Sequence, residues 1–249
     1  MAARGIVIEF DFAAMDGAEL LFETTKKFLK ELDNIQFDET LEARYLAGRT
    51  YQEGLARLFA QAKTKKTAQK AARDLAAAFS VAVTKAAPEA IGQSLRNFVK
   101  ALREADVAVA IATRADLEAV RPAFESAFGE GIVLYHEESD GYGFAPWDAL
   151  RRACMAMEMK HACVRSVTAS GFGVKAALLA GMKSFAVVRD RVAYQDFGGA
   201  NEIIDELSGR TAKTVLAQGP ASRGCMRSWF VSAIRRRVAP GIACRRWRP

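Results

Sequence analysis

The feature that most constrains the fold is a long helical stretch between two strand-like segments. Residues 5–12 (GIVIEFDF) are apolar and β-branched, which is typical of a buried central strand. From residue 18 to about residue 104, apolar residues recur at helical spacing with little β character. Residues 107–113 (VAVAIAT) then form a second buried strand pattern. The spacing predicts a split architecture, in which the first strand joins a later sheet and the helices between them are an insertion.

Strands and helices alternate beyond residue 113. We expect strands at 132–135, 162–167 and 184–188, and helices at 116–128, 147–160, 174–180 and 200–207. Such alternation predicts a parallel sheet with right-handed crossovers. The predicted fold class is therefore α/β, a Rossmann-like parallel sheet core with an inserted α-helical cap domain. The predicted domain bounds are 1–16 and 105–210 for the core, 17–104 for the cap and 211–249 for a tail.

The net positive charge of the chain comes from the end of that tail. The formal net charge is +7, yet residues 219–249 hold eight Arg and no acidic residue, which leaves 28 basic against 29 acidic residues before them. The main body is therefore close to neutral, which argues against a nucleic-acid-binding domain. The Arg-rich tail is predicted to be disordered, and it is the only segment for which nucleic-acid binding is considered. Its abrupt change of composition also fits the product of a shifted reading frame.

Two other classes of protein are excluded by composition. No apolar run reaches the length of about 18 residues that a membrane span needs, so no membrane partner is expected. The N-terminus resembles a strand rather than a signal or transit peptide, and a cytoplasmic protein is predicted. The four cysteines and two histidines show no zinc-ligand spacing, and no metal site is predicted from them.

Candidate site residues come from the ends of the predicted strands. In open parallel sheets, ligands bind at the carboxyl ends of the strands. Asp11, Thr113 and the loop after Val167 occupy those ends. They are the residues from which a site would be built.

These features resemble the haloacid dehalogenase (HAD) superfamily, in particular its helical-cap phosphoglycolate phosphatases and β-phosphoglucomutases. A strand that ends in Asp, a helical insert and a strand that ends in Thr follow the order of that family. The most specific segment is HACVRSVTASGFGVKAALLAGMKSFAVV (161–188), and LAGRTYQEGL (46–55) is similar to the start of the family's cap helices.

The resemblance implies phosphoryl transfer through an aspartyl-phosphate. That reaction needs a carboxylate nucleophile and a second carboxylate two residues on, which protonates the leaving oxygen. It also needs a hydroxyl donor and a lysine to hold the phosphoryl oxygens, and further acids to bind Mg²⁺. Without these cations the repulsion between carboxylate and phosphate is uncompensated.

Few of the residues that this chemistry needs are present. Asp11 matches the nucleophile and Thr113 matches the phosphate-binding hydroxyl. The remaining motif positions are degenerate: the general acid falls at Ala13, the lysine at Phe144, and the paired metal acids at Thr168 and Ala169. Lys175 and Asp190 are the nearest charges, and both are interpreted as surface residues.

Two functions follow from this pattern. The first is a pseudoenzyme or binding protein that keeps the phosphatase fold, needs no cofactor and has lost Mg²⁺-dependent activity. The alternative is an active HAD hydrolase that acts on a small phosphorylated metabolite, with Asp11 as nucleophile and Mg²⁺ as cofactor. The acids that could act as relocated ligands in that case are Asp16, Glu137, Glu138 and Asp140.

Overall fold

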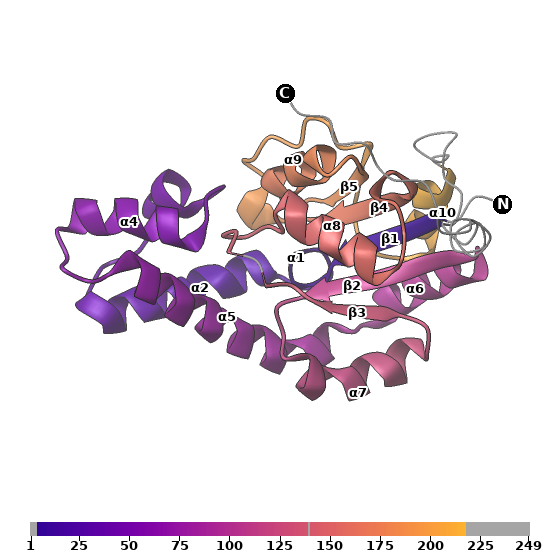
Figure 1. Ribbon diagram of the computed structural model, residues 1–249, viewed down its shortest axis with the longest axis horizontal. Helices are drawn as coiled ribbons and strands as arrows, with labels where there is room; N and C mark the ends of the chain where they lie inside the picture. Colours follow the sequence, from indigo (N-terminus) through magenta and orange to yellow (C-terminus); the bar gives the residue numbers. More distant parts are fainter. Residues whose placement is uncertain (1–3, 139, 218–249) are drawn as a thin grey trace, which may run out of the picture.

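The computed structural model describes residues 4–138 and 140–217, which form a parallel sheet with an attached helical cap (Figure 1). Within these residues the sheet has six strands in the order β3-β2-β1-β4-β5-β6. The strands are β1 (Arg4–Glu9), β2 (Val107–Thr113), β3 (Val133–His136), β4 (Val164–Thr168), β5 (Lys183–Val187) and β6 (Glu202–Ile204). Every pair of neighbours is parallel, so the predicted α/β fold is confirmed.

The first strand lies in the middle of the sheet. On one side Arg4 is opposite Val107 of β2, and on the other Gly5 is opposite Val164 of β4. Because all three strands run in the same direction, their carboxyl ends meet at one edge. The inserted helices leave and re-enter the core between β1 and β2.

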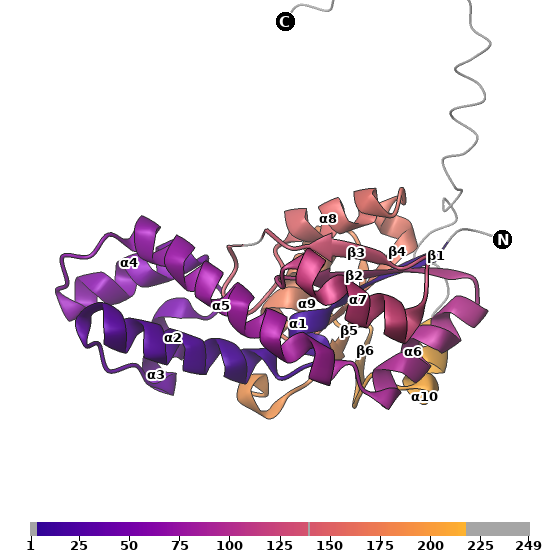
Figure 2. The same cartoon turned by 90° about the horizontal axis from the view of Figure 1, so that it is seen from below.

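Helices cover both faces of the sheet, as the alternation along β1 requires. Ile6 and Ile8 point into an apolar cluster shared with α6 (Gln93–Glu104), α7 (Leu117–Phe128) and α10 (Gly209–Ala217). Val7 points to the opposite face, where α8 (Trp147–Ala156) and α9 (Gly171–Leu179) pack. Figure 2 shows α8 on one side of the sheet and α6 and α10 on the other.

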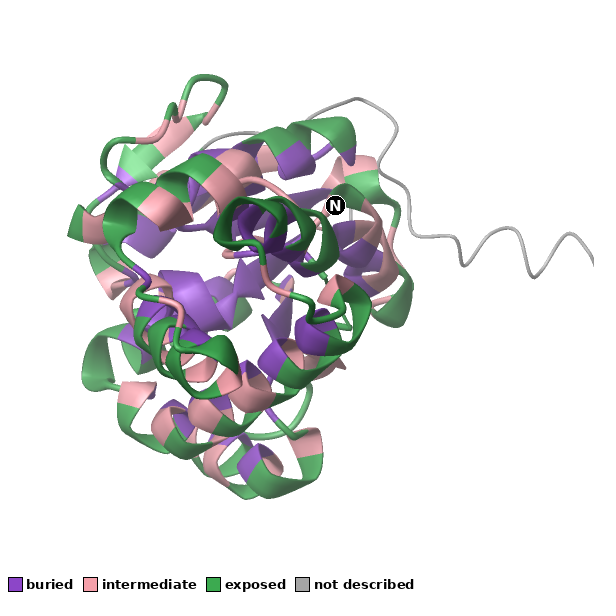
Figure 3. Ribbon diagram, turned by 90° about the vertical axis from the view of Figure 1, so that its left-hand side faces the viewer, coloured by how far each residue is buried: buried purple, intermediate pink, exposed green. Residues whose placement is uncertain are grey.

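The cap is a group of helices beyond the carboxyl edge of the sheet. Its elements are α2 (Gly17–Asp33), α3 (Glu39–Leu41), the π-helical turn η1 (Glu42–Leu46), α4 (Tyr51–Ala62) and α5 (Ala68–Ala90). α5 packs against α2 and α4, and it reaches down to α7 of the core. Figure 3 shows the buried residues gathered on the inner faces of these helices and the exposed ones outside.

Two predicted elements are wrong. The first strand ends at Glu9 rather than at residue 12, because Phe10–Ala13 form a single helical turn, α1, that leads the chain towards the cap. The segment 200–207, predicted as a helix, contains the edge strand β6. Its two isoleucines alternate in burial, Ile204 being buried and Ile203 exposed, which is the pattern of a strand and not of a helix.

Two segments differ from the predicted domain bounds. α6 lies inside the segment predicted as cap, but it packs against β2 and α10 of the core. Residues 211–217 belong to α10, with Thr211, Ala212 and Val215 buried, so they are not a disordered tail. The remainder of the Arg-rich tail lies outside the described residues. No described helix is long and apolar enough to cross a membrane.

Candidate functional site

Glu9 is the carboxylate at the end of the central strand. Its Oε1 accepts a hydrogen bond from the backbone N–H of Ala145 at 2.5 Å, and its Oε2 accepts one from the hydroxyl of Thr168 at the end of β4. The side chain is buried, with 1% of the residue exposed. Gly173 lets α9 approach this point closely, because a Cβ there would lie 2.0 Å from the Thr168 hydroxyl oxygen.

Asp11 is the second carboxylate, on the helical turn that follows β1. Its Oδ1 accepts a hydrogen bond of 2.6 Å from the hydroxyl of Thr113, the last residue of β2. Its Oδ2 accepts one of 2.8 Å from the backbone N–H of Arg114. Asp11 is also 1% exposed. The structure thus brings Asp11, Thr113 and Thr168 to one edge, together with Glu9.

Burial changes the acidity of both carboxyls. Loss of hydration raises the pKa of Asp11 to about 6, against the lowering effect of its hydrogen bond from Thr113. Loss of hydration raises the pKa of Glu9 to about 8, and the nearby negative charge of Glu137 adds to the increase. A carboxyl with a pKa of about 8 is mostly protonated at neutral pH, so Glu9 is a poor nucleophile there.

Arg114 fills the space between this edge and the cap. It follows Thr113, and its side chain is 5% exposed. One terminal nitrogen donates to the phenol oxygen of Tyr51 at 3.1 Å, and the other lies 2.9 Å from Oε1 of Glu137. The second nitrogen also donates to the backbone oxygens of Gly141 and Phe144. Burial by itself would lower the pKa of Arg114, but the Glu137 carboxylate raises it, so the guanidinium stays charged.

Aromatic rings surround the same guanidinium. Its central carbon lies 5.3 Å from the ring centroid of Phe12 and 5.7 Å from that of Phe79. Cation–π attraction favours a guanidinium over such rings. The buried charge is therefore compensated from the core, through Glu137, and from the cap, through Tyr51 and Phe79.

The loop after β3 holds the cap against the core. Thr50 caps α4 with a capping box that also involves Glu53, which fixes Tyr51 as the first helical residue. The backbone N–H of Tyr51 donates to the carbonyl of Asp140 at 2.7 Å, and Thr50 forms a β-bridge with Gly141. The start of α4 and this loop are thus joined by backbone hydrogen bonds, close to Arg114.

A second attachment lies on the other side of the cap. Arg191, in the 3₁₀ turn η3 (Asp190–Val192), contacts Glu19 at 2.8 Å and Glu42 at 3.0 Å. Its guanidinium also lies 3.6 Å from the ring centroid of Phe22. The cap is therefore held closed over the sheet edge at two separate places.

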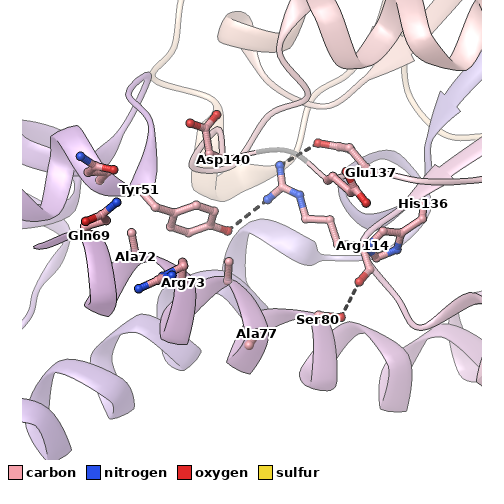
Figure 4. Close-up of a pocket in the computed structure, with 13 residues that line it drawn as sticks. Tyr51, Gln69, Ala72, Arg73, Ala77, Ser80, Arg114, His136, Glu137 and Asp140 are labelled. Carbon is pink, nitrogen blue, oxygen red and sulfur yellow. Dashed lines mark hydrogen bonds and ion pairs between the residues drawn. The ribbon is translucent and has the colours of Figure 1, made fainter.

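A pocket of about 500 Å³ lies between α4 and α5 of the cap and the loop after β3 (Figure 4). Arg114 and Glu137 lie at its inner end, and Tyr51 lines it with its phenol oxygen towards Arg114. Glu138 and Asp140, two of the acids considered as relocated ligands, line it as exposed side chains. Small-molecule sites have volumes of this order.

Comparison with known proteins adds the fold to this geometry. No family model and no curated protein matches the sequence. Among solved structures, β-phosphoglucomutase from Clostridium difficile has a TM-score of 0.62 at 11% identity, over 87% of this chain and 96% of that one. CbbY from Rhodobacter sphaeroides, solved in complex with phosphate, has a TM-score of 0.58 at 16% identity, over 83% and 95%. A HAD hydrolase from Entamoeba histolytica has a TM-score of 0.59 at 16% identity, over 81% and 92%.

The fold is that of the HAD hydrolases. Identities this low carry the fold and nothing finer.

The degenerate positions of the HAD motifs lie near the edge and carry no charge there. Ala13 is buried in α1, and its carbonyl accepts a hydrogen bond from Arg189. The Phe144 ring packs against that of Phe172, and Ala169 is buried after β4. Phe144 thus brings its carbonyl, and not a cation, towards the site.

The other charges considered lie elsewhere. Lys175 forms an exposed ion pair with Asp196, at 3.4 Å. Asp190 begins the 3₁₀ turn η3, and Asp16 precedes α2. None of these three is hydrogen-bonded to Glu9 or Asp11 in the contacts of the described residues.

Two residues of the site were missed by the sequence analysis. Glu9 was included in the strand pattern and given no role, although it precedes Asp11 by two residues, the spacing of the paired HAD carboxylates. That spacing was a usable signal. Arg114 was also missed, and its sequence position gave no signal, because its partners Tyr51 and Glu137 are brought to it only by the fold.

The residues at the edge do not fit Mg²⁺, the ion that the HAD fold implies. Mg²⁺ is held by carboxylate oxygens and waters in octahedral geometry. All four carboxylate oxygens of Glu9 and Asp11 accept hydrogen bonds from the chain, and no acid follows β4 at Thr168 or Ala169. The described residues contain no group of three or more His, Cys, Asp or Glu arranged to hold a metal ion.

Proposed function

We propose that this chain is a binding protein on a HAD hydrolase fold, without Mg²⁺-dependent phosphoryl-transfer activity. The observation that carries the proposal is the state of the two carboxylates at the sheet edge. Both are buried, and each of their oxygens already accepts a hydrogen bond. Each of these residues is only 1% exposed, so neither carboxylate has an open path by which a phosphorus atom could approach it.

The charge balance of the site supports the same proposal. A phosphate beside Asp11 needs cations to offset the repulsion between two anions. The guanidinium of Arg114, whose positive charge acts on Asp11, is paired with Glu137 and bonded to two carbonyls and Tyr51. Turning it towards a phosphate would leave Glu137 buried and unpaired, which costs several kcal/mol.

The alternative function is an active phosphomonoesterase that acts on a small phosphorylated metabolite. One observation favours it: Glu9 and Asp11 stand two residues apart at the strand end, the spacing that nucleophile and general acid require. In this arrangement Glu9, and not Asp11, would occupy the nucleophile position. In the other register, Asp11 is the nucleophile and Ala13 stands at the position of the general acid.

The experiment is an assay of phosphatase turnover. Purified protein is given p-nitrophenyl phosphate and a panel of sugar phosphates, with and without Mg²⁺, beside Asp11→Asn and Glu9→Gln. We expect all three proteins to give the same background rate, because loss of one preorganised electrostatic contact already lowers a rate by about a hundredfold to a thousandfold. Asp74→Asn, a change of an exposed acid on α5, serves as the matched control.

Turnover above about 1 s⁻¹, the low end of ordinary enzymes, would contradict the proposal if it disappeared in either carboxylate variant. Loss in Glu9→Gln and Asp11→Asn alike would support a carboxylate pair in the active register. Loss in Asp11→Asn alone would support Asp11 as the sole nucleophile.

A further inference from the structure

The pocket beside Arg114 has an acidic side. Glu137, Glu138 and Asp140 lie on the loop after β3 and line the pocket, and Figure 4 shows Glu137 beside Arg114 and Asp140 nearer to Tyr51. The charge of Glu137 is balanced by Arg114, at 2.9 Å. Glu138 and Asp140 remain exposed, with Arg73 on the cap side as the opposing charge. The balance of these groups is negative.

Glu137 also has an unused hydrogen-bond acceptor. Its Oε1 is bonded to Arg114, but its Oε2 has no hydrogen-bond partner, although the side chain is only 1% exposed. A buried polar atom without a partner costs about 1–3 kcal/mol. A hydrogen-bond donor brought to this oxygen would remove that cost.

The opposite wall, on α5, carries small alanine side chains among the polar side chains of Gln69, Arg73 and Ser80. Ala72, Ala76 and Ala77 on α5 line the pocket on the cap side, and their methyl groups leave room for a narrow aliphatic chain. A ligand that fits both walls has two parts. One end carries hydrogen-bond donors and a positive charge, and the rest is a short apolar chain.

We propose that this pocket binds a small cationic ligand, an amine or guanidinium on a short aliphatic chain, with its charged end towards Glu137, Glu138 and Asp140. The inference rests on the proposed binding function, since it names the class of ligand bound. It differs from the phosphorylated metabolite that the fold alone would suggest.

The test uses agmatine as the cationic probe and inorganic phosphate as the anionic one, by isothermal titration with the full chain. We expect agmatine to bind, and we expect its affinity to fall as the salt concentration is raised. Glu138→Gln and Asp140→Asn each remove one exposed charge and should weaken it by about two- to fivefold. Asp74→Asn, an exposed acid on the same helix as Arg73 but outside the pocket, should leave the affinity unchanged.

Glu137→Gln tests the inner end, and we expect it to weaken agmatine more than either exposed variant does, with circular dichroism as the check on folding. Three results would each overturn the proposal. They are absence of agmatine binding, an agmatine affinity in Glu138→Gln and Asp140→Asn equal to that of the original chain, and binding of phosphate in place of agmatine. This titration and the phosphatase assay test different claims. Turnover that depends on Asp11 would refute the proposed function, whereas the agmatine titration tests whether the pocket binds a cation.

Discussion

The carboxylates on the two sides of Arg114 differ in how they are hydrogen-bonded. At the sheet edge, Glu9 and Asp11 are buried, and every oxygen accepts a bond from the chain. In the pocket, Glu137 keeps one oxygen without a partner, and Glu138 and Asp140 are exposed. The first set is internally satisfied, whereas the second has capacity left for a ligand.

This difference separates the place where the fold usually binds its substrate from the pocket where we propose that this chain binds its ligand. Buried polar groups are normally paired within the protein, so the unpaired Oε2 of Glu137 is an exception among the buried carboxylates. The edge of the sheet, where HAD-type chemistry would occur, lacks such groups among the carboxylates described. Arg114 forms the boundary between the two regions, since it donates its backbone N–H to Asp11 and its side chain to Glu137.

The largest expected effect is on stability, from removal of that boundary. Arg114→Met leaves the Glu137 carboxylate buried without its partner, and we expect the free energy of unfolding in urea to fall by about 3–5 kcal/mol. Arg73→Met, at an exposed arginine of the same pocket, should change it by less than about 0.5 kcal/mol. Adding Glu137→Gln to Arg114→Met should restore part of the loss, and no recovery would show that the ion pair is not the cause.

A smaller effect, of opposite sign, is expected from Glu9. Its pKa of about 8 in the folded chain exceeds the ordinary value of 4.5, so the stability that it contributes is present at low pH and is lost as the pH rises towards 8. Glu9→Gln removes this dependence and should raise the free energy of unfolding at pH 8.5 by about 3 kcal/mol.

The pH window between 6.5 and 8 isolates Glu9, because the pKa of Asp11, about 6, lies below it. Urea titrations across this window should slope downwards in the original chain and be nearly flat in Glu9→Gln. An unchanged slope in the variant would mean that Glu9 is already ionised in the folded chain.

The smallest effect sharpens the comparison from the pocket side. Glu138→Gln and Asp140→Asn change exposed carboxylates, so each should alter the free energy of unfolding by no more than about 0.5 kcal/mol. Thermal melts of these variants beside Arg114→Met measure the contrast directly. A loss near that of Arg114→Met would show that these acids are structural.

Much of the core could be predicted from local pattern. The run VAVAIAT predicts β2 with its bounds, Val107–Thr113, because an uninterrupted apolar segment in an α/β chain is a buried strand. Thr113 was placed at the sheet edge for the same reason. The split by a helical insert also followed from periodicity, and the pairing of β1 with β2 bears it out.

The polar network could not be predicted in this way. Hydrophobic periodicity does not say where a strand ends, so Glu9 was read as part of a longer strand when Phe10–Ala13 turn into a helix. It also does not say which distant residues meet, and Arg114 acquires its role from Tyr51 and Glu137. The prediction of a helix at 200–207 is wrong for another reason. β6 is only three residues long, which is too short to show the alternation of apolar and polar residues that marks a strand.

The central position of β1 has a consequence for how the chain folds. Residues 4–9 pair with residues 107–112 on one side and residues 5–8 with 164–167 on the other. At synthesis rates of about 5–20 residues per second, roughly 5–20 s pass between the synthesis of β1 and that of β2, its partner strand. The helices of the cap contact one another within residues 17–90 and need no such wait. We therefore expect the inserted cap to become ordered first and the sheet to form last, around β1, the first strand to be synthesised. The apolar residues of β1 are exposed until then.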